Sequence, residues 1–159
     1  MGEIMDAIER GRKEHETRAK STKELVFDAL KQCQVREVIV DFDGAGDSGQ
    51  INDVLYKKGV GKKEGVSDDT LDNLDIEGAE VVHSTKWDEA KQDWVKLMKP
   101  VTLRDMIEQL CYDLLEANHG GWEINEGSFG EFHLMVKDDK IELTYNQRVE
   151  SIETEEETY

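Results

Sequence analysis

The clearest pattern in the sequence is an apolar stripe that recurs every three or four residues between residues 103 and 115. Side chains at these spacings lie above one another on one face of a helix, so the pattern predicts a buried helix. Thr102 precedes the stripe as a capping residue, and Gly120 follows it in a position that favours a left-handed, helix-ending backbone. The stripe consists of Leu103, Met106, Ile107, Leu110, Cys111, Leu114 and Leu115.

Ahead of that helix, the sequence predicts a shorter helix and a pair of strands. Residues 35–43 alternate between apolar and polar side chains, which indicates a strand with Asp41 and Asp43 on one face. Glycines then form a loop, and residues 51–56 return as a second strand. A capping box that starts at Ser21 predicts a helix before these strands.

After the helix, we expect a meander of three strands. The first covers residues 122–125, the second runs from 128 to about 136, and the third ends near 149. Residues 79–87 are expected to form another strand, and residues 88–98 fit either a short helix or a strand. These elements predict an α+β fold, with an antiparallel sheet of about five strands and two to three helices packed on one face.

Composition divides the chain into a central domain and two polar ends. Residues 1–20 are expected to form a mobile or marginally helical arm, because their apolar positions stop at Ile8. Residues 21–150 are expected to form a single α+β domain with an excursion over residues 57–100. Residues 151–159 are expected to be an acidic, disordered tail.

The charge of the chain limits its partners. The 159 residues carry a formal net charge of −17, and the first forty hold eight residues of each sign, so the excess lies on residues 41–159. Such a surface repels phosphate and attracts basic proteins, so we expect a basic protein partner and no direct nucleic-acid binding. No apolar run could span a membrane, no signal peptide is recognised, and both cysteines are expected as free thiols. A cytoplasmic protein is therefore expected.

Two loops that combine glycines with clustered carboxylates form the candidate site. Residues 41–50 follow the first strand, and residues 119–131 follow the long helix. We expect the two loops to meet on the face of the sheet that the helices leave open, although Trp122 also fits the core. The candidate binding residues are Asp41, Asp43, Asp47, Ser48, Gln50, His119, Trp122, Glu123, Asn125 and Glu131, with His133 on the same face.

Two familiar motifs are excluded, and one metal site is left open. The segment Gly46-Asp47-Ser48-Gly49 is similar to the loop of a trypsin-like serine nucleophile, but the chain lacks the other triad strands. An EF-hand that starts at Asp41 or Asp43 lacks the bidentate carboxylate at its twelfth position. Crowded carboxylates repel one another unless a cation or protons intervene, so an irregular Mg²⁺ or Ca²⁺ site stays open. Its ligands would be Asp43, Asp47 and Glu123, with Asp41 nearby; no other cofactor is expected.

The two loops also carry a family resemblance. Residues 43–50 read Asp-Gly-Ala-Gly-Asp-Ser-Gly-Gln, residues 119–123 read His-Gly-Gly-Trp-Glu after Tyr-Asp-Leu-Leu-Glu at 112–116, and residues 144–148 read Thr-Tyr-Asn-Gln-Arg. These segments resemble the signatures of a small bacterial and phage family of unknown function. The resemblance implies that the two loops form one site and that the setting is bacterial or phage cytoplasm. It implies no activity.

Two functional hypotheses follow. The first is an acidic, non-enzymatic interaction protein, such as a phage or mobile-element accessory protein or inhibitor, that binds a basic protein surface. The alternative is a divalent-metal-dependent hydrolase or small-ligand-binding domain that uses the same acidic loops. In the alternative, Asp43 or Glu123 would act as a base and His119 would stand at the mouth of the site.

Overall fold

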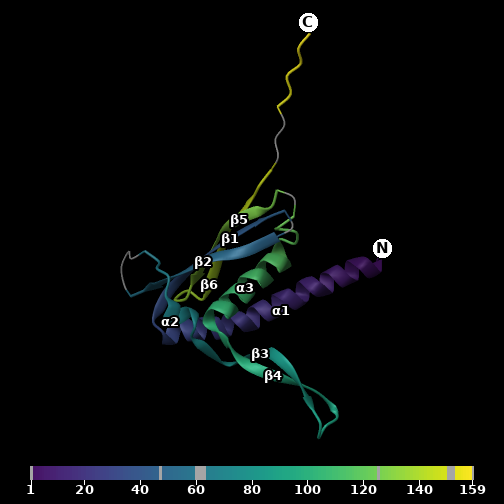
Figure 1. Ribbon diagram of the computed structural model, residues 1–159. Coiled ribbons are helices and arrows are strands. Elements are labelled where there is room, and N and C mark those ends of the chain that lie inside the picture. Colours follow the sequence, from purple (N-terminus) through teal and green to yellow (C-terminus); the bar gives the residue numbers. More distant parts are fainter. Residues whose placement is uncertain (1, 47, 60–63, 125, 150–152, 159) are drawn as a thin grey trace.

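The main sheet has four antiparallel strands in the order β2-β1-β5-β6. The computed structural model describes residues 2–46, 48–59, 64–124, 126–149 and 153–158. Figure 1 shows the long helices α1 and α3 side by side against one face of this sheet. The predicted α+β fold with helices on one face is therefore confirmed. The bounds are β1 Val35–Ala45, β2 Ser48–Lys58, β5 Ser128–Met135, β6 Lys140–Gln147, α1 Gly2–Gln32 and α3 Leu103–Asn118.

The core lies between these two helices and the sheet. On β1, Val38, Val40 and Phe42 are buried, and the residues between them face the other way. On β5, Phe132 and Leu134 continue the same apolar layer. The predicted α3 stripe faces this layer, and α3 is capped as expected, because the Thr102 hydroxyl accepts a hydrogen bond from the Asp105 amide at 3.2 Å. We call the helix-covered side of the sheet the inner face, and the opposite side the outer face.

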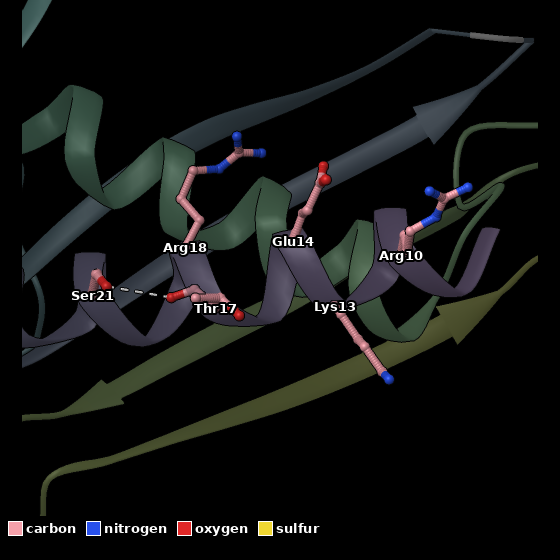
Figure 2. Close-up of a pocket in the computed structure, with 6 residues that line it drawn as sticks. All are labelled: Arg10, Lys13, Glu14, Thr17, Arg18 and Ser21. Carbon is pink, nitrogen blue, oxygen red and sulfur yellow. Dashed lines mark hydrogen bonds between the residues drawn. The ribbon is translucent and has the colours of Figure 1, made fainter. Parts of the chain in front are cut away.

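The first helix begins earlier than the capping box predicts. Helix α1 is continuous through Ser21, whose hydroxyl donates a hydrogen bond to the Thr17 carbonyl instead of capping a helix start (Figure 2). Earlier in the helix, Arg12 forms ion pairs with Glu9 and Glu16, the neighbours one turn away on either side. Local side-chain pairing therefore supports helix where apolar periodicity alone indicated only a marginal arm.

Of the strand expected over residues 122–125, residues 122–124 are described, and they do not form a strand. The Trp122 amide donates to the His119 carbonyl at 3.1 Å, and the Ile124 amide donates to the Gly121 carbonyl at 3.0 Å, so residues 119–124 make consecutive turns. Gly121 has a φ of +82°, a conformation that glycine adopts without steric cost. The main sheet consequently has four strands instead of about five.

The excursion over residues 57–100 contains a separate hairpin. A short helix, α2 (Asp69–Asp72), precedes strands β3 (Asp75–Asp88) and β4 (Asp93–Thr102), which pair with each other to form a two-stranded sheet. Figure 1 shows this hairpin extending away from the main sheet. The strand predicted over residues 79–87 is confirmed, and the ambiguous residues 88–98 form a turn and most of β4.

An ion pair between a buried aspartate and a half-exposed arginine joins the two long helices. Asp113 of α3 is 1% exposed, and its two carboxylate oxygens accept hydrogen bonds from Arg18 of α1 at 2.9 and 2.7 Å. The Nδ1 atom of His15 lies 2.8 Å from the same carboxylate. Burial opposes the ionised form of Asp113, but the hydrogen bonds from Arg18 and His15 prevail and lower its pKa. The carboxylate is therefore charged at neutral pH and fixes α1 against α3.

We expect Asp113→Asn to destabilise the fold by about 2 kcal/mol at pH 7, because the substitution leaves Arg18 without its charged acceptor. The matched control is Asp28→Asn, which makes the same charge change at an exposed position of α1. Since the folded-state pKa of Asp113 is lowered, its contribution is present above about pH 4 and disappears as the pH falls through the folded-state pKa. Urea unfolding at a series of pH values would test this, and equal effects of the two substitutions would contradict it.

Candidate functional site

The two predicted loops meet on the inner face, around the Trp122 ring. Trp122 is 4% exposed and packs edge-on against Phe42, with ring centroids 5.8 Å apart. A Cβ atom at Gly44 would lie 2.8 Å from this ring, and one at Gly49 would overlap it. Both glycines thus give the ring access to the bare backbone of the β1–β2 hairpin. The loops meet as predicted, but the predicted face is wrong: they meet on the inner face, because the buried Trp122 ring packs against the hairpin glycines there, and not on the open face.

Hydrogen bonds hold the second loop in this position. The indole N–H of Trp122 donates to a Glu116 carboxylate oxygen at 3.2 Å, and the Ser128 hydroxyl donates to the Trp122 carbonyl at 2.7 Å. Gly127, with a φ of +74°, passes so close to the Gly44 carbonyl that a Cβ atom would overlap it. These contacts join the end of α3, the β1–β2 hairpin and the start of β5 into one packed unit.

Arg148 joins the same segments from the end of β6. Its Nη1 atom donates to the carbonyls of Gly44, Ser128 and Glu126 at 3.1, 3.4 and 3.5 Å. Its Nη2 atom donates to an Asp43 carboxylate oxygen at 3.0 Å, and the guanidinium lies 4.9 Å from the centre of the Phe129 ring. Sequence reasoning placed Arg148 in a family signature but did not assign it a role.

The candidate residues are divided between the two faces of the sheet. Asp41 and Asp43 alternate with the buried residues of β1 and lie on the outer face, where Glu131 is the register partner of Asp41. On the outer side of β2, Gln50 pairs with Asp43 and Ser48 pairs with Ala45.

The remaining candidates lie on the inner side or outside the described residues. His119 stacks on Tyr145 at 3.8 Å, with its ring nearly parallel, and therefore covers the core. Glu123 follows Trp122, and a Cβ atom added at Gly44 would lie 3.0 Å from the Glu123 Cα atom. Asp47 and Asn125 lie outside the described residues. Among the residues that are described, no group of three or more His, Cys, Asp or Glu is arranged to hold a metal ion; the set that includes Asp47 stays a prediction.

The outer face carries a network of ionised groups centred on His133. Its Nδ1 atom lies 2.9 Å from Glu37, and its Nε2 atom lies 3.1 Å from Glu131. Both ring nitrogens donate only in the imidazolium form, and the hydrogen bond to Glu37 raises the pKa of His133. Burial works against the charge of Glu37, but His133 and Lys57 together lower its pKa. Glu37 was missed at the sequence level, although it precedes Asp41 in the same alternation.

Next to this network, Asp41 is crowded by other carboxylates. The register of β1 and β2 shifts between Val40 and Phe42, so that Asn52 and Asp53 both stand opposite Asp41. Burial, followed by the charges of Glu131 and Asp53, raises the pKa of Asp41. No salt bridge in the described part of the chain joins Asp41, Asp53 or Glu131 to a lysine or arginine.

A shallow concavity of about 420 Å³ opens above these carboxylates. Phe129, which is 43% exposed, forms an apolar wall, and the polar groups come from all four strands of the sheet. A site with several carboxylates, one aromatic ring and amide groups suits a cationic group more than an anionic one. The lining residues are Asp41, Phe42, Asp43, Asn52, Phe129, Gly130, Glu131, Thr144 and Asn146.

Fold and site together define an α+β protein whose half-covered antiparallel sheet carries a carboxylate-rich concavity on its open face. The chain belongs to a family of unknown function, DUF6878, whose model matches residues 19–159. That range contains both loops and Arg148, and it begins within α1. Comparison with curated proteins and with solved structures gave no match. None of the described helices is long and apolar enough to cross a membrane.

We expect Gly49→Ala to destabilise the protein by about 1–3 kcal/mol, because the added methyl group overlaps the buried Trp122 ring. Gly11→Ala is the matched control, since a Cβ atom there meets nothing within 4 Å and the helix gains about 1 kcal/mol. Thermal unfolding of both variants would show opposite shifts in Tm. Equal or reversed shifts in Tm would mean that the contact with Trp122 does not restrict the size of the side chain at position 49.

The raised pKa of His133 predicts that stability falls as the pH rises above about 6.5. Below about pH 6.5 its contribution is fully present, and it is lost as the pH rises through the folded-state pKa. At pH 6, His133→Gln should have a lower free energy of unfolding than the wild type. At high pH, the free energies of unfolding of the two proteins should become similar. NMR titration of the imidazole, combined with urea unfolding, measures both effects. A folded-state pKa at or below 6.5 would contradict the network.

Proposed function

We propose that this protein is a non-enzymatic interaction module that binds a basic segment of a protein partner on its outer face. The observation that carries the proposal is the pair of Asp41 and Glu131, which line the concavity without a lysine or arginine partner in the described part of the chain. Asp53 adds to the negative charge at Asp41, and the nearby cation, His133, is shared between Glu131 and Glu37. A cation from a partner would supply the missing countercharge.

Neighbouring carboxylates on the outer face support this view, because they already have cations of their own. Glu37 pairs with Lys57 at 3.5 Å, Glu142 with Lys140 at 2.9 Å, and Asp43 with Arg148 at 3.0 Å. These three pairs surround the central group. The outer face therefore has a rim of carboxylates paired with lysine or arginine and an acidic centre where His133 is shared by Glu131 and Glu37. This charge pattern guides a basic side chain toward the concavity.

Arg148 supports the choice of ligand. Its guanidinium lies over the Phe129 ring while it donates to Asp43, so one edge of the concavity already holds an arginine by the two contacts expected of a bound one. A partner arginine or lysine at Asp41 and Glu131 would use the remaining carboxylates beside the same ring. The net charge of −17 would speed its approach at low ionic strength.

A labelled nine-residue arginine peptide provides the probe. We expect it to bind in a salt-dependent manner, and the double substitution Asp41→Asn/Glu131→Gln should weaken binding by about tenfold, or about 1.4 kcal/mol. The matched control, Glu24→Gln/Asp28→Asn, removes the same charge from exposed positions of α1 and should leave the affinity nearly unchanged. Fluorescence anisotropy at low and high salt measures both variants.

Two outcomes would contradict the proposal. Equal loss of affinity in the two double variants would mean that the peptide responds only to net charge. Binding that is indifferent to salt would mean that the carboxylates do not carry the interaction. Circular dichroism of both variants establishes that the fold is retained before affinities are compared.

A further inference from the structure

The β3–β4 hairpin exposes two tryptophans that the core does not use. Trp87 is 42% exposed and Trp94 is 63% exposed. The two residues are register partners on opposite strands, and their rings form a T-shaped pair with centroids 5.6 Å apart. We call residues 84–99 the arm, and Figure 1 shows β3 and β4 extending away from the helices and the main sheet.

The tryptophan pair stabilises the arm, but this role does not account for its exposure. A cross-strand aromatic pair contributes roughly 0.2–1 kcal/mol to a hairpin through the ring surfaces that touch each other. Much of the surface of Trp94 still faces solvent, since its side chain is among the most exposed large hydrophobic groups of the described residues. Tryptophan is among the residue types most enriched at the hot spots of protein interfaces.

The charge of the arm differs from that of the rest of the chain. It contains four lysines and three carboxylates, a net charge of +1, whereas the whole chain carries −17. The register places Lys96 opposite Thr85, on the same side of the ribbon as Trp87 and Trp94. One side of the arm therefore presents aromatic rings together with an ammonium group. The lysines are Lys86, Lys91, Lys96 and Lys99.

This chemistry fits an acidic protein surface better than a phosphate-rich one. Nucleic acids and anionic membranes are bound by clusters of cations, whereas the register of the arm places a single lysine, Lys96, on the side of the two tryptophans. An acidic protein surface with an apolar wall would receive both the ring of Trp94 and the ammonium group of Lys96. The outer face of the main sheet is such a surface, because Phe129 stands there beside Asp41 and Glu131.

We propose that the arm of one molecule binds the outer face of a second copy of this chain, with Trp94 and Lys96 in the concavity beside Phe129, Asp41 and Glu131. This inference rests on the proposed function of the outer face and names one occupant for it. The volume of about 420 Å³ lies within the range of pockets that enclose groups larger than a single side chain. Because the arm and the face are different surfaces, the contact is heterologous and can join more than two molecules.

The experiment uses two variants of the full chain, each defective in one half of the contact. Trp94→Ala/Lys96→Glu removes the arm contact, and Asp41→Asn/Glu131→Gln removes the face contact. Sedimentation velocity should show concentration-dependent association of the wild type, with a Kd on the order of 10 μM, and monomers for each variant alone. An equimolar mixture of the two variants should form a one-to-one complex, since one retains the face and the other retains the arm.

Several results would overturn the inference. A wild type that stays monomeric at concentrations well above this Kd would do so, and so would a mixture of the two variants that stays monomeric. Lys96→Glu alone keeps the tryptophan pair and should still weaken association, so damage to the hairpin by Trp94→Ala cannot produce the whole result. Glu24→Gln/Asp28→Asn should associate like wild type.

The same variants separate this inference from the proposed function. The arm variant should still bind the arginine peptide at its intact outer face. If the wild type is monomeric but binds the peptide through Asp41 and Glu131, the self-association fails while the proposed function stands. If the face variant binds the peptide as well as wild type does, the proposed function fails.

Discussion

The packing of the Trp122 ring against the bare backbone at Gly44 and Gly49 is the contact on which the rest of the structure depends. Three elements meet at Trp122: the end of α3 and the β1–β2 hairpin contact its ring, and the start of β5 binds its carbonyl oxygen. The ring also touches Phe42, the largest apolar side chain at the centre of β1. Because buried interiors are packed as densely as crystals, a side chain at either glycine would have to displace the ring and every element that it joins.

This contact also explains why the two glycine-rich loops do not form a single acidic site. Trp122 and Glu123 belong to the inner side, whereas Asp41 and Asp43 point outward from the same hairpin. Much of the glycine-rich composition that the two loops share has a structural role. Their glycines allow close approach of the backbones, and Arg148 donates hydrogen bonds to three of their backbone carbonyls. The carboxylates that remain free for binding are those of the outer face.

Periodicity predicted the parts of the fold that local sequence controls. The α3 stripe, its Thr102 cap and the alternation of β1 were all predicted, because each depends on neighbours within a few residues. The turns at residues 119–124 were not, since a segment containing Trp122 and Ile124 has strand-like composition and only the tertiary contact with two distant glycines makes it a turn. The full length of α1 was missed for the same reason: Asp113, ninety-five residues away from Arg18, anchors its first half.

The candidate site was predictable only in part. Alternation placed Asp41, Asp43 and Glu131 on one face of the sheet, but it could not show that Arg148 neutralises Asp43 and leaves Asp41 unpaired. That difference decides between a surface that is acidic for solubility and one that is acidic for binding. Solubility requires only dispersed charge, and the paired rim formed by Glu37, Glu142 and Asp43 already meets that need.

The carboxylates at the centre of the outer face, Asp41 and Glu131, exceed what solubility requires. Like charges directly opposite each other in a sheet destabilise it by roughly 0.2–1 kcal/mol, so Asp41 facing Glu131 lowers the stability of the free protein. A threonine or lysine at either position would avoid this cost while keeping the molecule soluble. A partner cation would remove the repulsion between Asp41 and Glu131 on binding. The free energy of that repulsion, which destabilises the unbound protein, would then favour binding.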